Sequence, residues 1–172
     1  LIKAYFWNKK FNIKYFNEAK KLGTAGSLSL MKNEIKSDFF LVNCDVLFDL
    51  NLMDIINYHK RQKSDLTIIA AHEEHKVPYG VCEVAKNGRL KAIKEKPNLG
   101  LLINTGIYFI SKKLLKYIPH KKYDLTDLIK DSKRRNLKVF TYIISSKSWK
   151  DLGQKEDLIN ISKEKILKWK KI

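Results

Sequence analysis

Residues 39–45 read Phe-Phe-Leu-Val-Asn-Cys-Asp, and this stretch decides the fold class of the 172-residue chain. Residues 39–43 form an almost continuous apolar run, as expected of a strand that is buried on both faces of a sheet. Ligands of open α/β sheets bind beyond the carboxyl ends of the strands, which is where Asp45 follows this run. An aspartate there either caps the next segment or holds a hard cation through its oxygens. On the residues alone, both interpretations stay open.

Around this strand, short β-rich runs alternate with longer amphipathic stretches, which is typical of an α/β layer architecture. The pattern predicts strands at 12–16, 39–43, 66–71, 81–84, 90–94, 103–110 and 139–144. Asn87-Gly88 predicts a hairpin between the fourth and fifth of these. Helices are predicted at 24–33, 52–61, 111–117 (after Ser111 as cap), 125–135 (after Asp124 as cap) and 156–169. We therefore expect a single domain over residues 1–172, with a mixed sheet and helices on both faces.

The net charge of +17 raises the alternative of a nucleic-acid-binding protein. Lysine supplies 31 of the 35 basic residues, whereas guanidinium is the group suited to bidentate recognition of bases and phosphates. The charge is also spread along the chain without a long basic run. The composition therefore favours a lysine-rich solvated surface, with only weak, non-specific binding to nucleic acid.

Two further features bear on location. No apolar run reaches the roughly 18 residues that cross a bilayer, and residues 1–10 lack the apolar core of a signal peptide. Cys44 and Cys82 have no metal-ligand spacing and are expected to be reduced thiols. We expect a cytoplasmic protein that does not associate with membranes.

Three other motifs carry polar chemistry, and each has a plain structural alternative. Leu22-Gly23-Thr24-Ala25-Gly26 lets the backbone approach a ligand, or is only a tight turn before a helix. Glu95-Lys96-Pro97 places a carboxylate beside an ammonium, as a sugar phosphate requires, or is an exposed ion-paired turn. Trp149-Lys150-Asp151-Leu152-Gly153 holds a second aspartate, which an ordinary loop explains equally well.

Taken in order, these motifs make the chain resemble the sugar-1-phosphate nucleotidyltransferases, which form nucleotide-sugars from a nucleoside triphosphate and a sugar 1-phosphate. The resemblance runs from about Phe11 to the predicted last helix. Besides the four motifs above, it rests on Glu18, His59, Val77-Pro78-Tyr79-Gly80-Val81 and Ile103-Asn104-Thr105-Gly106-Ile107-Tyr108. The form of the motifs is most similar to mannose-1-phosphate guanylyltransferases and their glucosamine and heptose relatives, while thymidylyl-, uridylyl- and cytidylyltransferases share much of it.

The resemblance implies a Rossmann-like three-layer sandwich around a mixed, mostly parallel sheet, and a role for each matched residue. Asp45 and Asp151 would hold Mg²⁺, and with Lys96 they would form the catalytic set. The nucleotide would contact Glu18, Gly23, Thr24 and Ala25. The sugar phosphate would contact Tyr79, Gly80, Glu95, Lys96, Asn104, Thr105 and Gly106. His59 is interpreted as helix packing, and Cys44 stands where the family commonly has glycine.

One element of the family has no counterpart in the sequence. The family begins with a glycine-rich loop that carries an arginine, followed by a Pro-Lys pair, and these hold the triphosphate. Residues 1–10 contain no glycine, arginine or proline. We therefore expect the family fold to lack its first two strands here, with exposed strand edges and impaired transfer. A sugar-phosphate-binding protein without catalysis, or a partner of a full-length transferase, is the alternative, and a homo-oligomer stays open.

Overall fold

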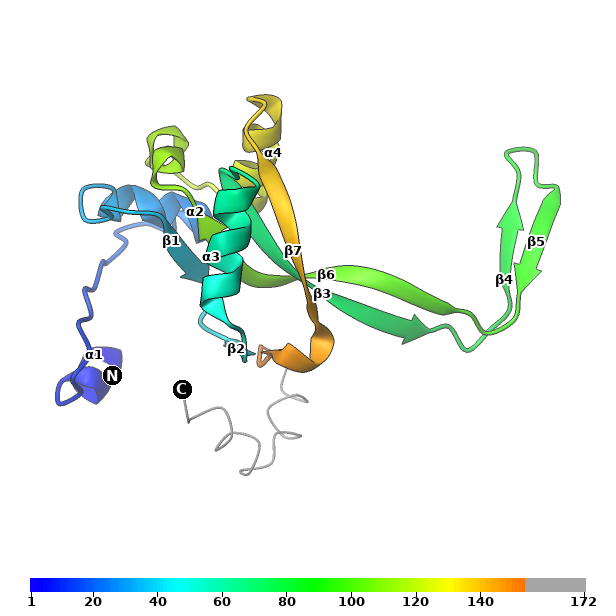
Figure 1. The fold of residues 1–172 in the computed structure, drawn as a ribbon, viewed down its shortest axis with the longest axis horizontal. Coiled ribbons are helices and arrows are strands. Elements are labelled where there is room, and N and C mark those ends of the chain that lie inside the picture. Colours follow the sequence, from blue (N-terminus) through cyan, green and yellow to red (C-terminus); the bar gives the residue numbers. More distant parts are fainter. Residues whose placement is uncertain (154–172) are drawn as a thin grey trace.

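The computed structural model describes residues 1–153, and its centre is a four-stranded sheet (Figure 1). The strand order is β1-β6-β3-β7, with bounds Phe39–Val42, Asn98–Ile110, Leu66–Lys76 and Val139–Ser145. Strand β6 runs antiparallel to both neighbours, whereas β3 and β7 are parallel. Strands β1, β3 and β7 therefore share one direction, which confirms the mixed sheet, although two of its three pairings are antiparallel.

Helices pack on both faces of this sheet because its strands alternate their side chains between two apolar clusters. On one face Tyr108 and Ile110 of β6 pack with α2 (Gly23–Gly26), η1 (Ser27–Met31), η2 (Lys112–Tyr117) and α4 (Leu125–Arg134). On the other face Ile107 and Phe109 pack with Ile55 of α3 (Leu52–Arg61). The expected three-layer α/β architecture is thus confirmed.

Strands β3 and β6 continue beyond the sheet as a two-stranded arm (Figure 1). The arm ends in the hairpin of β4 (Val81–Val84) and β5 (Leu90–Lys94), which lies far from the helices (Figure 1). The hairpin has the predicted bounds, and in its turn the Arg89 N–H donates to Asn87 Oδ1 over 3.3 Å. Leu99, Leu101 and Leu102 on the arm are about half exposed, whereas the sheet end of the same strand is buried.

Several predicted elements need correction. Residues 12–16 are not a strand but an exposed irregular segment after a short helix, α1 (Ile2–Phe6). The helix predicted at 24–33 is one α-helical turn followed by a 3₁₀ turn, and 111–117 is the 3₁₀ helix η2. Strand β1 is only half-buried because it is an edge strand. The helix predicted at 156–169 lies outside the described residues.

Two short strands that the sequence pattern did not predict form a second sheet. They are β2 (Val46–Phe48) and β8 (Trp149–Asp151), paired antiparallel, and β8 follows the 3₁₀ turn η3 (Ser146–Ser148). By contrast, α3 and α4 confirm the predicted helices to within a residue, and Asn51 Oδ1 caps α3 by accepting from Met53 N–H over 3.1 Å. Within residues 1–153, no helix is long and apolar enough to cross a membrane.

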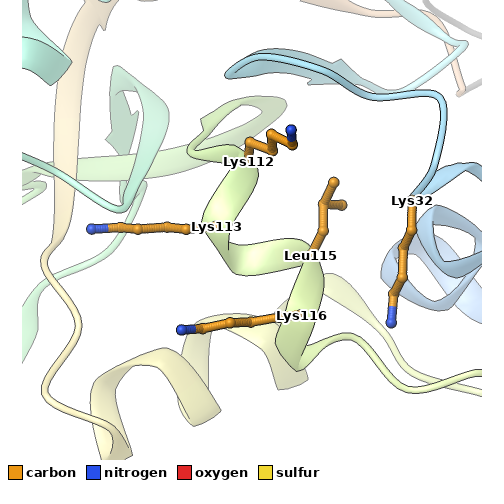
Figure 2. Close-up of a pocket in the computed structure, with 5 residues that line it drawn as sticks. All are labelled: Lys32, Lys112, Lys113, Leu115 and Lys116. Carbon is orange, nitrogen blue, oxygen red and sulfur yellow. The ribbon is translucent and has the colours of Figure 1, made fainter.

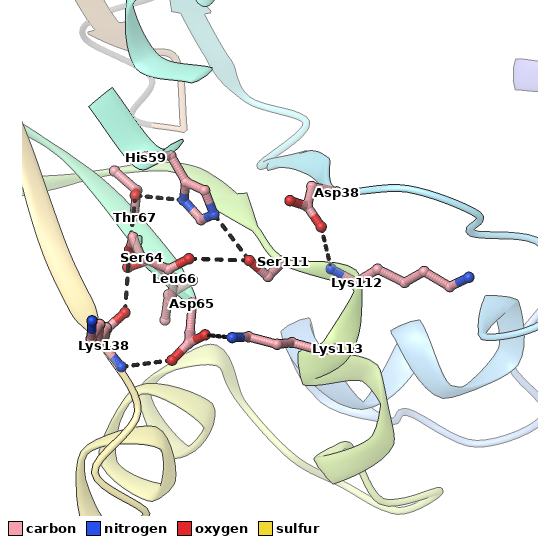
Figure 3. Close-up of polar contacts among 10 residues, drawn as sticks. All are labelled: Asp38, His59, Ser64, Asp65, Leu66, Thr67, Ser111, Lys112, Lys113 and Lys138. Atoms are coloured by element: carbon pink, nitrogen blue, oxygen red, sulfur yellow. Dashed lines mark hydrogen bonds and ion pairs between the residues drawn. The ribbon is translucent and has the colours of Figure 1, made fainter. Parts of the chain in front are cut away.

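His59 lies at the end of α3 in a buried polar network (Figure 3). Its Nδ1 lies 2.8 Å from Thr67 Oγ1, and its Nε2 lies 3.0 Å from Ser111 Oγ. Ser111 Oγ also donates to the carbonyl of Ser64 over 3.2 Å, so this side chain does not cap η2 as predicted. Burial lowers the pKa of His59. These contacts agree with the packing role expected for this histidine.

Asp65, just before β3, links the start of that strand to the segment before β7 and to η2 (Figure 3). It is 4% exposed, its Oδ2 accepts from the Lys138 N–H over 2.8 Å, and its Oδ1 pairs with the Lys113 ammonium. Burial alone would raise the pKa of this carboxyl, but Lys113 and the Lys138 N–H outweigh it and lower the pKa. The network lies at the amino ends of β1 and β3, opposite the end of β1 where Asp45 follows.

Candidate active site

Asp45 and Asp151 lie together although they are far apart in the sequence. The pairing of β2 with β8 places Val46 opposite Asp151, and the Leu152 N–H donates to the carbonyl of Asp45 over 2.8 Å. A methyl group at Gly153 would lie 3.1 Å from Asp45 Oδ2 and 3.1 Å from Asp151 Oδ1. Both carboxylates therefore face the same small space, as a shared cation requires.

The segments that carry the two aspartates meet at an irregularity of β6. The register of β6 against β3 shifts between Ile69 and Ala70, which leaves Thr105 and Gly106 outside the ladder. The carbonyl of Gly106 accepts from the Asn43 N–H over 3.0 Å, and the carbonyl of Thr105 accepts from the Trp149 indole N–H over 2.9 Å. We call this pair of residues the β6 bulge.

Gly106 is the residue that makes the bulge sterically feasible. Its φ is +75°, and an added Cβ would lie 2.7 Å from the side-chain nitrogen of Asn43. The hydroxyl of Thr105, which is buried, donates to the carbonyl of Ile69 over 2.8 Å. These two residues were predicted to form the floor beneath a sugar. The structure shows their carbonyls bonded to the segments that bear Asp45 and Asp151, and the sugar contact stays a prediction.

A pocket of about 430 Å³ opens beside Asp45. It is lined by Thr24, Ser27, Leu41, Val42, Asn43, Cys44, Asp45 and Leu125. The predicted nucleotide contact Thr24 and the predicted metal ligand Asp45 thus share one cavity, at the carboxyl end of β1 where ligands of such sheets bind. The Cys44 thiol is exposed in this wall, so the pocket retains open volume with cysteine in place of glycine.

The Gly-Thr-Ala-Gly turn is fixed by contacts to the start of α4. Thr24 N–H donates to Asp124 Oδ1 over 3.2 Å, and Thr24 Oγ1 accepts from the Leu125 N–H over 2.9 Å. Gly23 has a φ of +76°, and a Cβ there would lie 2.5 Å from Asp124 Oδ1. Ala25 is fully buried. Of the predicted nucleotide contacts, only Thr24 therefore lines the pocket.

Glu18 has a local structural contact. Its Oε2 accepts from the Leu22 N–H over 3.0 Å, which closes the turn before the glycines. Asn104 is also engaged, because its side-chain nitrogen donates to the Tyr108 hydroxyl over 2.6 Å and its Oδ1 accepts from the Gly106 N–H over 3.3 Å. Both residues support the backbone around the site in this structure.

The remaining sugar-side residues lie on the arm, apart from the carboxylates (Figure 1). Tyr79 is 74% exposed, and Glu95 and Lys96 are exposed after β5. Glu95 Oε2 lies 3.0 Å from where a Cβ of Gly80 would be, so these two residues are neighbours. The structure thus brings Gly80 and Glu95 together, with Tyr79 and Lys96 next to them in the chain, but it does not bring them to Asp45 and Asp151.

A second pocket, of about 610 Å³, is lined by Lys32, Lys112, Lys113, Leu115 and Lys116 (Figure 2). Lys32 Nζ donates to the carbonyl of Ile118 over 2.5 Å, and Lys113 pairs with Asp65. The Lys113 and Lys116 side chains extend to the same side of η2, whereas Lys112 and Lys32 point elsewhere (Figure 2). Because Lys116 also lies over the Tyr117 ring, three of the four lysines already have partners, and we assign no ligand to this pocket.

Three residues of the site received no role from the sequence. Asn43 lies two residues before Asp45 and lines the pocket, Ser27 lines the pocket one turn after Thr24, and Trp149 contacts the β6 bulge. Helical spacing from Thr24 would have indicated Ser27, since i and i+3 share a face. No local signal indicates the contact of Trp149, because it depends on a bulge in another strand.

The fold and the paired carboxylates define an α/β protein with a candidate cation site beside a pocket at the carboxyl end of a strand. The chain belongs to the family described as "Nucleotidyl transferase", whose family model matches residues 3–167. This confirms the family resemblance given by the motifs.

Among curated proteins, the chain is similar to mannose-1-phosphate guanylyltransferases. It is 28% identical to the probable mannose-1-phosphate guanylyltransferase 3 of Arabidopsis thaliana, over 92% of this chain and 50% of that protein. It is 30% identical to mannose-1-phosphate guanyltransferase beta-B of Xenopus laevis, over 83% of this chain and 41% of that protein. The chain thus spans about half the length of the curated relatives it matches, or less.

A solved structure confirms the fold. HddC from Yersinia pseudotuberculosis, in a crystal structure complexed with GMP-PN, superposes with a TM-score of 0.67 at 22% identity. The superposition covers 92% of this chain and 70% of that one. At this identity the likeness supports the fold class and carries no residue roles.

Proposed function

We propose that the chain provides the metal-binding and substrate-binding part of a transferase that moves a nucleotidyl group from a nucleoside triphosphate to a sugar 1-phosphate. The products would be a nucleotide-sugar and pyrophosphate. The observation that carries the proposal is the meeting of Asp45 and Asp151 beside a pocket in a member of this family. GTP is the favoured nucleotide because the relatives described above are named guanylyltransferases.

The residues present fit Mg²⁺. Asp45 and Asp151 offer carboxylate oxygens to one small space, and Mg²⁺ in phosphate-transfer sites is commonly bound by one or two carboxylates together with substrate phosphates and water. Among the described residues, no group of three or more His, Cys, Asp or Glu side chains is arranged to hold a metal by itself. When bound, the cation would neutralise phosphate charge during the transfer. Soft metals would require more thiolate or imidazole ligands than this site has.

The chain's own residues would contribute mainly positioning, which is the larger part of phosphoryl-type catalysis. Thr24 and Ser27 border the pocket and would contact the nucleotide. Lys96 would hold the sugar phosphate as a point charge, and Glu95 would accept from sugar hydroxyls. Because both lie on the arm, their action at Asp45 requires the arm to bend toward the sheet.

A second candidate function is sugar-phosphate binding without catalysis, alone or beside a full-length transferase. Two observations favour it. Glu95 and Lys96 lie apart from the carboxylates, and the 172 residues contain no glycine or arginine before Gly23 that could hold a triphosphate. We accordingly propose that this chain alone transfers slowly or not at all. Cytoplasmic location stays a prediction.

A pyrophosphate-release assay tests both functions. The chain is incubated with Mg²⁺, mannose 1-phosphate and each nucleoside triphosphate, with and without a peptide bearing the glycine-rich loop and Pro-Lys pair of a guanylyltransferase. We expect turnover only with the peptide, fastest with GTP, and none in Asp45→Asn. Robust turnover by the chain alone would contradict the impairment. Calorimetric binding of mannose 1-phosphate without turnover under any condition would favour the second function.

A further inference from the structure

Both carboxylate-bearing segments are attached to the same two residues of β6. The Asn43 N–H reaches the carbonyl of Gly106 over 3.0 Å, two residues before Asp45. The Trp149 indole reaches the carbonyl of Thr105 over 2.9 Å, two residues before Asp151. Because Thr105 and Gly106 are adjacent, two consecutive peptide units of β6 relate the two segments to each other. This attachment adds to the direct β2–β8 pairing in setting the separation of the aspartates.

The indole contact is the only one of these links that a side chain makes. Trp149 is partly buried and packs with the apolar cluster of Ile55 and Ile107, while its backbone pairs with Phe48. Those contacts would hold any large apolar side chain in place. The hydrogen bond from the indole N–H adds a fixed direction, because a donor must point at the carbonyl oxygen.

We propose that Trp149 is a positioning residue, whose hydrogen bond to Thr105 sets Asp151 at the distance from Asp45 that one divalent cation requires. This inference rests on the proposed function of the two aspartates. Mg²⁺ demands nearly ideal octahedral geometry at about 2.0–2.1 Å, so a small displacement of one carboxylate weakens binding. Groups that orient metal ligands in this way typically change affinity by about 10- to 100-fold when removed.

The test measures Mn²⁺ binding to the full 172-residue chain by electron paramagnetic resonance of free Mn²⁺. The variant Trp149→Phe removes the N–H and keeps an aromatic ring, and Trp7→Phe is the same substitution at an exposed residue. We expect about tenfold weaker Mn²⁺ binding in Trp149→Phe and no change in Trp7→Phe. In an Asp45→Asn background, Trp149→Phe should cause no further loss, because only one carboxylate remains to be positioned.

Thermal unfolding of the same variants separates positioning from stability. A lower Tm of Trp149→Phe with unchanged Mn²⁺ affinity would mean that the indole only stabilises the fold, and the inference would be overturned. If Asp45→Asn and Asp151→Asn also bind Mn²⁺ like the unsubstituted chain, the metal role itself is wrong, and the proposed function fails with it. If the aspartate substitutions weaken Mn²⁺ binding but Trp149→Phe does not, the inference about Trp149 is overturned and the proposed function stands.

A measurement on the unsubstituted chain covers the case in which Trp149→Phe does not fold. The indole ¹H–¹⁵N resonance of Trp149 is assigned by elimination, with Trp7→Phe and Trp169→Phe. We expect slow exchange of this proton with solvent, and paramagnetic broadening by substoichiometric Mn²⁺. Fast exchange would show that the bond to Thr105 is absent in solution, and a resonance untouched by Mn²⁺ would place the cation elsewhere. Either result overturns the inference.

Discussion

Asp45 and Asp151 point their carboxylates at one space beside Gly153, where a methyl group would lie 3.1 Å from an oxygen of each. The arrangement depends on the pairing of β2 with β8. Each strand is only three residues long, and the two lie about a hundred residues apart in the sequence. Two like charges that face one space repel each other, and a cation between them would relieve that repulsion, which is the physical basis for proposing a metal at this position.

Replacing either aspartate should weaken the binding of a cation between them. We expect Asp45→Asn and Asp151→Asn each to weaken Mn²⁺ binding at least tenfold, because a single carboxylate supplies too little charge and too few oxygens. Isothermal titration measures the affinity, and circular dichroism checks the fold. Asp54→Asn on the exposed surface of α3 is the matched control and should bind Mn²⁺ normally. Equal loss in the control would assign the effect to net charge.

Gly153→Ala places a methyl group in the space between the Asp45 and Asp151 carboxylates. Its methyl group would contact both oxygens at 3.1 Å, closer than most side-chain carbons come to their neighbours, so the carboxylates must move apart. We expect weaker Mn²⁺ binding with a free energy of unfolding within about 0.5 kcal/mol of the unsubstituted chain, since the residue is exposed. Urea denaturation gives the stability. Unchanged metal affinity would mean that the cation binds on another side of the carboxylates.

The sequence predicted elements well wherever local chemistry specifies them. Helix α3 has its apolar spacing and a side-chain cap at Asn51, and the β4–β5 hairpin has Asn87-Gly88 in its turn. The strand predicted at 12–16 was wrong, because its apolar residues find no neighbouring strand within the described chain. Strands β2 and β8 were missed, since three residues show no periodicity and their pairing is set by distant segments.

The residues of the candidate site also fall into those that the sequence indicated and those that only the structure reveals. Asp45 was indicated by its position after a buried run, and Asp151 only by resemblance to the family. The bulge at Thr105 and Gly106 could not be predicted, because it arises from a register shift between β3 and β6. For the same reason, the roles of Thr105 and Trp149 required the structure, and the arm positions of Glu95 and Lys96 differ from the compact site expected.

His59 makes the stability of the fold dependent on pH. Burial lowers its pKa in the folded chain, whereas in the unfolded chain the value is about 6.5. The unfolded state therefore takes up the proton first, and the stability from neutral His59, present above pH 6.5, is lost as the pH falls through the folded-state value. Urea denaturation at pH 7.5 and 5.5 should show this loss.

His59→Gln separates this residue from the other titrating groups. Glutamine can still bond with Thr67 and Ser111 but does not titrate, so we expect a smaller difference in stability between the two pH values. If the pKa of His59 is one unit lower in the folded than in the unfolded chain, the free energy of unfolding differs by about 1.4 kcal/mol between a pH above both pKa values and a pH below both. The same pH dependence in His59→Gln would show that other groups cause it.

Lys113→Met tests the ion pair with Asp65. Asp65 stays ionised in the fold because Lys113 and the Lys138 N–H offset its burial, so its lowered pKa stabilises the chain above about pH 4 and this stability is lost as the pH falls further. Without the ammonium, a carboxylate that is 4% exposed keeps only the Lys138 N–H. We expect a loss of about 1–3 kcal/mol at pH 7, measured by urea denaturation.

The loss should shrink as the pH falls toward 4, because the pKa of Asp65 rises in the variant and protonation removes the buried charge. Lys116→Met is the control: the residue lies on the same face of η2, three residues along, and its ammonium lies over the Tyr117 ring at 4.8 Å rather than beside a carboxylate. That variant should show a small loss that does not change with pH. A loss in Lys113→Met that is the same at pH 7 and pH 4 would assign it to the lysine's packing, because a loss caused by the charge of Asp65 must change when that carboxyl takes up a proton.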